Sequence, residues 1–182
     1  MKPFFAVHGG EYLVGSHIEK HFKRVNVWIP SRDTGIDLLV SDHRNRRTVS
    51  LQVKFSKDYL VTEGKAEFQK SFRASGFWTI DRDKLRRSPS DFWVFVLVGF
   101  AARTTDFVVV PRRELARLLQ SLHPEKTIRT YLSVMEHKER CWENRGLKYK
   151  DMRRIADGEF RDARRDLKEW LNNWHPVEQL NR

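Results

Sequence analysis

Short segments rich in β-branched and aromatic residues alternate with polar turns through most of the chain, a pattern typical of β-strands. The longest apolar run, FWVFVLVGFAA, starts at Phe92. It is too short to cross a bilayer as a helix and suits a buried strand. Proline or a glycine-containing turn bounds several segments. The predicted strands are residues 25–29, 36–40, 48–55, 77–80, 92–99 and 106–110.

Other segments repeat their apolar residues at helical spacing. A first amphipathic helix is predicted after Gly9-Gly10, and residues 62–74 and 112–122 have the same periodicity. In the tail, residues 158–174 place aromatic and aliphatic side chains on one stripe, which predicts a C-terminal helix packed on the domain.

The order of these elements predicts an α/β fold, in which a mixed central sheet is flanked by helices on both sides. We find no linker that would separate two domains. The prediction is a single domain over residues 1–182, with a core at about 8–110 and a helical C-terminal extension at about 111–182.

Charge adds a first indication of function. The chain has 182 residues, 35 Lys+Arg against 24 Asp+Glu, and a formal net charge of +11. Hydrophobic residues make up 40% and aromatic residues 12%, which excludes a disordered basic tail. The basic excess is spread along the chain and favours an anionic partner such as nucleic acid. The alternative is a basic surface that serves only solubility.

Cysteine and histidine usage limits the kinds of site. The single cysteine, Cys141, excludes an internal disulfide and a cysteine-based zinc site, and fits a reducing compartment. The N-terminal segment has no unbroken apolar region, so we expect no signal peptide, no membrane association and a cytoplasmic location. His17 and His21 have a zinc-compatible spacing, but no third ligand is evident, and we expect them on a helix surface.

The candidate chemistry lies between residues 11 and 57. Gln52 and Lys54 are two apart on one predicted strand, so both side chains point to the same face of the sheet. Asp37 lies on the preceding strand, across a short loop, and is expected opposite or diagonal to that pair. Glu11, in the first helix, can join them. A carboxylate, an amide and an ammonium are thus predicted to converge.

Such a group suits a hard divalent cation, which takes oxygen ligands from a few protein groups and keeps water or substrate phosphates for the rest. Asp37 would supply the charged ligand, Gln52 an amide oxygen and Val53 a carbonyl. Lys54 would orient or deprotonate the attacking water, or offset charge on a pentacovalent phosphate.

The pattern Glu11, Gly35-Ile36-Asp37 and Gln52-Val53-Lys54, in the predicted order of helix and strands, resembles the PD-(D/E)XK nuclease superfamily. This superfamily includes restriction-endonuclease-like and Holliday-junction-resolvase-like proteins. The resemblance covers roughly residues 8–100. Thr34 precedes Gly35, so the literal Pro-Asp pair is absent.

The resemblance implies catalytic roles for Asp37, Gln52, Lys54 and Glu11. Asp37, Gln52 and Glu11 would hold Mg²⁺ or Mn²⁺, and Lys54 corresponds to the catalytic lysine. Gln52 stands where the superfamily usually has Asp or Glu. Losing that negative charge weakens the expected metal affinity and increases the dependence on Glu11.

The expected function is therefore a magnesium-dependent endodeoxyribonuclease acting in restriction, repair, recombination or mobile-element defence. Because many members dimerise to cut both strands, the resemblance also implies a homodimer. One alternative is an inactive nucleic-acid-binding module of the same fold, and another is a protein-interaction domain that binds an acidic partner.

Basic residues follow the second predicted strand. A loop with the sequence SDHRNRR and the residues after the third strand could contact phosphates beside the site. The alternative for each is a solvated turn. The candidate nucleic-acid-binding residues are Arg44, Arg46, Arg47 and Lys57.

Overall fold

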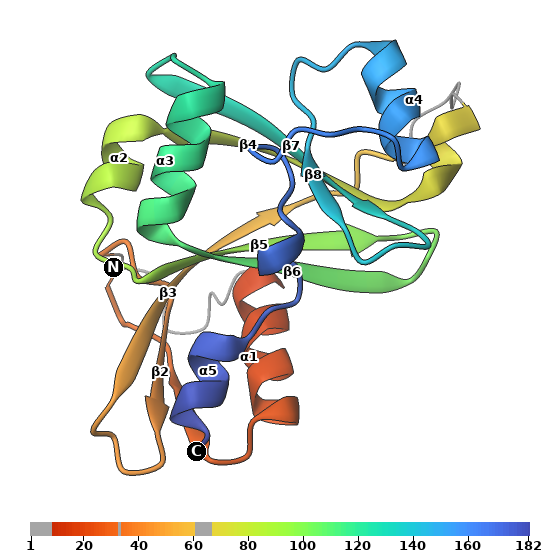
Figure 1. Ribbon diagram of the computed structural model, residues 1–182. Helices are drawn as coiled ribbons and strands as arrows, with labels where there is room; N and C mark the ends of the chain where they lie inside the picture. Colours follow the sequence, from red (N-terminus) through yellow and green to blue (C-terminus); the bar gives the residue numbers. More distant parts are fainter. Residues whose placement is uncertain (1–8, 33, 61–66) are drawn as a thin grey trace.

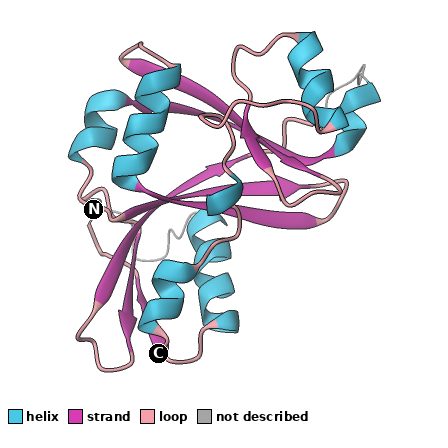
Figure 2. Ribbon diagram, viewed as in Figure 1, coloured by secondary structure: helices cyan, strands magenta, loops and turns pink. Residues whose placement is uncertain are grey.

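The computed structural model describes residues 9–32, 34–60 and 67–182 (Figure 1). It shows a mixed α/β protein with two sheets, one mixed and one antiparallel. Figure 2 shows the helices lying around and between these sheets. The α/β class is confirmed, but the way the central sheet is covered differs from the prediction.

The first sheet has five strands in the order β1-β2-β3-β5-β6. β1, β2 and β3 pair antiparallel, β3 pairs with β5 in parallel, and β5 returns antiparallel to β6. The mixed central sheet is therefore confirmed. Its strands are β1 (Val25–Trp28), β2 (Leu38–Asp42), β3 (Thr48–Ser56), β5 (Phe92–Gly99) and β6 (Thr104–Pro111).

Two helices, α1 (Gly9–His21) and α5 (His175–Leu180), cover one face of this sheet (Figure 1). α1 buries Val14 and Ile18 against the sheet, as its sequence pattern predicts. Arg24 donates its backbone N–H to the side chain of Asn181 at 2.9 Å, which joins the end of the chain to the region after α1.

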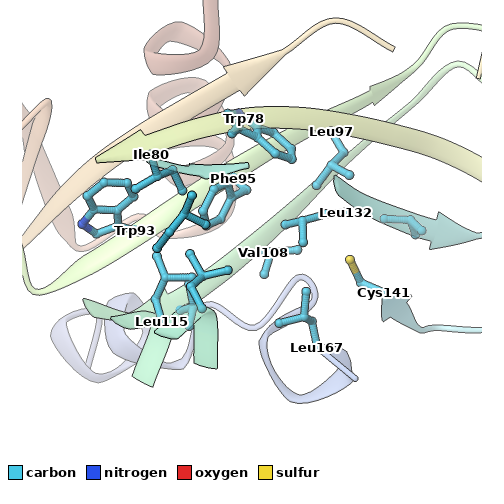
Figure 3. Packing of buried hydrophobic residues seen from close by; sticks show 14 of the residues in the cluster. Trp78, Ile80, Trp93, Phe95, Leu97, Val108, Leu115, Leu132, Cys141 and Leu167 are labelled. Atoms are coloured by element: carbon cyan, nitrogen blue, oxygen red, sulfur yellow. The ribbon is translucent and has the colours of Figure 1, made fainter. Parts of the chain in front are cut away.

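The other face is covered mainly by a second sheet instead of by helices alone. This antiparallel sheet has the order β4-β7-β8, and α3 (Arg112–Leu122) packs beside it. Figure 3 shows Trp78 of β4 against Phe95 of β5, with ring centroids 4.9 Å apart. The strands are β4 (Phe72–Asp81), β7 (Thr127–Met135) and β8 (Cys141–Glu143).

The predicted helix at residues 62–74 is wrong in its described part. Residues 62–66 lie outside the described residues, Glu67–Ser71 form a short 3₁₀ helix, and Phe72 begins β4. The predicted strand at 77–80 is thus the end of a strand more than twice as long. Alternate residues of β4 are buried, including Ala74, Trp78 and Ile80, so its period is two.

The predicted helix at residues 158–174 is also wrong. This segment holds only a 3₁₀ turn, Lys168–Trp170, and the final helix starts at His175. Phe160, Leu167 and Trp174 are each buried in a different one of the three apolar clusters. The apolar stripe therefore comes from an extended segment that crosses the molecule, and tertiary packing decides its conformation.

Two short helices were not predicted: α2 (Arg82–Arg87), after β4, and α4 (Tyr149–Asp157), after β8. β7 and β8 were not predicted either. Membrane-spanning helices were not found: within the described ranges, no helix has the length and apolarity that a bilayer crossing requires.

His17 lies partly buried in an aromatic group, against the expectation of a surface position. Its ring stacks on Trp174 with centroids 4.9 Å apart, and the ring of Phe107 lies 4.8 Å away. Burial lowers the pKa of His17 from 6.5 to about 4, and the nearby His21 and Lys20 act in the same direction. The folded protein therefore holds this ring neutral.

We expect the free energy of unfolding to fall as pH drops from about 6.5 towards 4. In that window the unfolded chain protonates His17 and the folded protein does not, so protonation favours unfolding. Thermal unfolding at pH 7.5 and pH 5 tests this. His17→Gln should reduce the loss of melting temperature between the two pH values, and an unchanged loss would contradict the assignment.

Candidate functional site

A cavity of about 1130 Å³ opens between the start of α1, the turn before β2, the ends of β3 and β5, and α2. It contains all four residues predicted to carry the chemistry, together with side chains that were not predicted. The lining includes Glu11, Asp37, Gln52, Lys54, Trp93 and Lys84.

The cavity forms where β2 separates from β3. The backbone N–H of Asp37 donates to the carbonyl of Leu51 at 2.8 Å, and the register of the two strands starts at Leu38 and Leu51. Beyond Leu51, no described residue pairs with this edge of β3 as a strand. The Asp37 carboxylate instead accepts the backbone N–H of Val53 at 2.8 Å. The side chain thus takes the place of a strand partner at an open edge.

Gly35 makes the turn that leads into this position. Its φ of +84° lies in the left-handed region, where glycine carries no steric penalty. A Cβ there would also lie 3.2 Å from the Pro89 ring. The turn therefore needs glycine, and it directs Asp37 towards β3.

Gln52 and Lys54 share one face of β3, as their spacing predicts. Gln52 donates its Nε2 to Oδ2 of Asp37, and both side chains are buried. Gln52 also pairs in register with Trp93 on β5. The Lys54 ammonium lies 5.1 Å from the centre of the Trp93 ring, within cation–π range. Trp93 is a buried floor that holds the ammonium beside the Asp37–Gln52 pair.

Glu11 reaches the cavity from the opposite face of the sheet. It lies in the first turn of α1 and is buried. Gly10 allows the close approach, because a Cβ there would lie 2.6 Å from the Cβ of Phe55 on β3. The cavity wraps around the open edge of β3, so residues from both faces line it.

The donor set fits a magnesium-type cation. Within the described part of the chain, no three His, Cys, Asp or Glu side chains gather as a metal cluster. The cavity instead offers the carboxylates of Glu11 and Asp37, together with an amide. Mg²⁺ is commonly held by one or two carboxylates with water and substrate phosphate completing the shell, so this sparse set of oxygens suits it.

Gln52 fits less directly as a ligand. Its amide nitrogen faces Asp37, so its oxygen would face a cation beside Asp37 only after rotation of the amide. In the arrangement seen here, Gln52 orients the Asp37 carboxylate by a hydrogen bond.

The structure does not bring the predicted nucleic-acid-binding residues to the cavity. Arg44, Arg46 and Arg47 lie in the β2–β3 hairpin, at the opposite end of β3 (Figure 1). Arg47 is five residues from Gln52, roughly 16 Å along a strand. Lys57 lies just after β3, and its ammonium is 5.1 Å from the ring centre of Tyr59.

Asp42 organises that hairpin. Its carboxylate accepts the backbone N–H groups of Arg44 and Arg46, at 3.2 and 2.9 Å, and an ion pair from Arg47 at 3.1 Å. These hydrogen bonds, first that from Arg46, hold the pKa of Asp42 below its ordinary value. One basic residue of the loop is thus already paired.

Three lining residues were not predicted: Trp93, Lys84 and Arg87. Trp93 is an aromatic residue at the start of an otherwise mostly aliphatic strand, a weak signal that the sequence does offer. Lys84 and Arg87 lie in α2, whose sequence RDKLRR is basic, but no local pattern places that helix beside β3.

No family model, no curated protein and no solved structure matches this chain, so the description of the site depends on its own geometry.

Proposed function

We propose that this protein is a Mg²⁺- or Mn²⁺-dependent endonuclease that hydrolyses DNA phosphodiester bonds in the cavity around Asp37. The observation that carries the proposal is the meeting of Glu11, Asp37, Gln52 and Lys54 in one cavity, from three separate parts of the chain. The sequence resemblance to the PD-(D/E)XK nucleases and the net charge of +11 support the same activity.

The residues divide the work as follows. Asp37 and Glu11 would hold the cation, and Gln52 with the Val53 N–H would keep the Asp37 carboxylate in place. A cation held there supplies Lewis-acid polarisation of the phosphate and lowers the pKa of a bound water. The Lys54 ammonium, steadied by Trp93, would offset the charge that builds up on the phosphoryl oxygens.

A second function is favoured by one observation. Gln52 is neutral and directs its amide nitrogen to Asp37, an arrangement that satisfies the carboxylate without a metal. A descendant that binds DNA and no longer cleaves it would look the same.

We expect nicking of supercoiled plasmid DNA in Mg²⁺ or Mn²⁺, and loss of nicking to background when EDTA removes the cation. The reason is that the cavity offers only two carboxylates and one lysine, too little charge stabilisation for the reaction without a metal. Gel analysis of nicked and linear plasmid over time measures the rate.

DNA binding at low salt is measured on the same preparation. Binding without cleavage under both metals would contradict the nuclease and support the binding module. Absence of both binding and cleavage would contradict both proposals and leave the protein-interaction alternative.

A further inference from the structure

α2 forms the rim of the cavity on the sheet face opposite α1. Its Leu85 is buried in the cluster beneath the second sheet, whereas Val14 and Ile18 of α1 pack on the other face. Lys84 and Arg87 of α2 both line the cavity that holds Asp37 and Lys54. Being three residues apart on a helix, they project to the same side.

This helix is held firmly. The Asp81 carboxylate caps its start by accepting the backbone N–H of Lys84 at 2.8 Å. Leu85 anchors its middle in the core, and Arg112 donates to the carbonyl of Arg86 at 2.6 Å near its end. The positions of Lys84 and Arg87 relative to the cavity are thus determined by the core.

The charges of Lys84 and Arg87 are available to a ligand. Both side chains are exposed, and in the described part of the chain neither forms an ion pair. Arg87 makes only a hydrogen bond of 3.3 Å to the backbone carbonyl of Asp83. The Asp83 carboxylate pairs with Lys126 instead, at 3.7 Å. Two cations therefore face the cavity from one wall.

The cavity has an acidic wall and a basic wall. Glu11 and Asp37 lie where β3 is open, and Lys84 and Arg87 lie across from them on α2. Its volume of about 1130 Å³ exceeds the roughly 300–1,000 Å³ of usual small-molecule pockets. Such a space has room for more than one phosphate of a strand.

We propose that Lys84 and Arg87 bind the DNA backbone next to the bond that is cut, and that α2, instead of the β2–β3 hairpin, holds the substrate strand. The proposal rests on the proposed nuclease function. With a phosphodiester at Asp37, a neighbouring phosphate of the same strand would lie at α2. Contacts of this kind position a strand and raise affinity without reading sequence.

The test measures binding of a duplex oligonucleotide in EDTA, without cleavage, between 50 and 200 mM KCl. The variant is K84Q/R87Q, and the matched control is R44Q/R46Q, which removes the same charge from the exposed hairpin. For K84Q/R87Q we expect about tenfold weaker binding. Its salt dependence, as the slope of log K against log[salt], should fall by about 1.4–1.8, because each lost phosphate contact removes about 0.7–0.9.

R44Q/R46Q should keep close to the wild-type slope. Equal losses in the two variants, or a loss only in R44Q/R46Q, would overturn the proposal. Thermal unfolding shows whether each variant is folded, and single variants K84Q and R87Q replace the double variant if it is not.

Plasmid nicking by the wild-type protein separates this proposal from the proposed function. Wild-type nicking with an unchanged slope in K84Q/R87Q defeats the role of α2 alone. A reduced slope in K84Q/R87Q without any wild-type nicking supports the role of α2 in binding and defeats the nuclease.

Discussion

Replacing Asp37 by Asn is expected to lower metal-dependent DNA nicking by at least about 100-fold. The substitution keeps the size of the side chain and an oxygen that can accept from Val53 N–H, but it removes the negative charge beside the cavity. Charge stabilisation by a bound cation is worth several kcal/mol. Each 1.36 kcal/mol corresponds to about tenfold in rate. Initial rates of plasmid nicking in Mg²⁺ and in Mn²⁺ provide the measurement.

Asp42→Asn is the matched control. Asp42 is a buried carboxylate of the same strand region that likewise accepts backbone N–H bonds, but it lies in the hairpin away from the cavity. It should retain most of the nicking rate. Wild-type nicking by Asp37→Asn would contradict the proposed site, and equal losses in the two variants would show a general effect on the fold.

Replacing Glu143 by Ala is expected to destabilise the fold by about 3–5 kcal/mol, the usual cost of removing one partner of a buried ion pair. Glu143 is fully buried in β8. Its carboxylate lies 2.9 Å from His123 Nε2 after α3, and accepts from Thr130 of β7 at 3.1 Å. It also accepts from Arg165 at 2.5 Å. Without Glu143, the buried guanidinium of Arg165 loses its carboxylate. Urea unfolding at pH 7 measures the change.

The control for this variant is Glu114→Ala, which breaks an exposed ion pair with Arg117 at the same helix spacing of three residues. Such pairs contribute about 0–1 kcal/mol. A shift for Glu143→Ala as small as that for Glu114→Ala would mean that the buried network does not hold the second sheet to the rest of the domain.

Local periodicity predicted the central sheet well. β1, β2, β3, β5 and β6 appear within a few residues of their expected positions, since each carries a run of β-branched or apolar residues bounded by turns. α1 and α3 follow for the same reason. The prediction failed where one apolar pattern had two solutions.

The second sheet is one such failure. Phe68 and Phe72 are four apart, which favours a helix, but Phe72 is also the first residue of an alternating strand with nine residues after it. The segment 158–174 is the other failure, because each of its large apolar residues packs against a different cluster. In both segments tertiary contacts override local propensity.

For the candidate site, the sequence by itself determined that Gln52 and Lys54 share a face, since side chains alternate along any strand. It also determined that Asp37 meets them, since a short hairpin aligns neighbouring strands. Only the tertiary structure decided that α2 and Trp93 complete the cavity and that the hairpin arginines lie far from it. Those placements join segments separated by tens of residues in the chain. They depend on long-range packing between the two sheets, which no local spacing encodes.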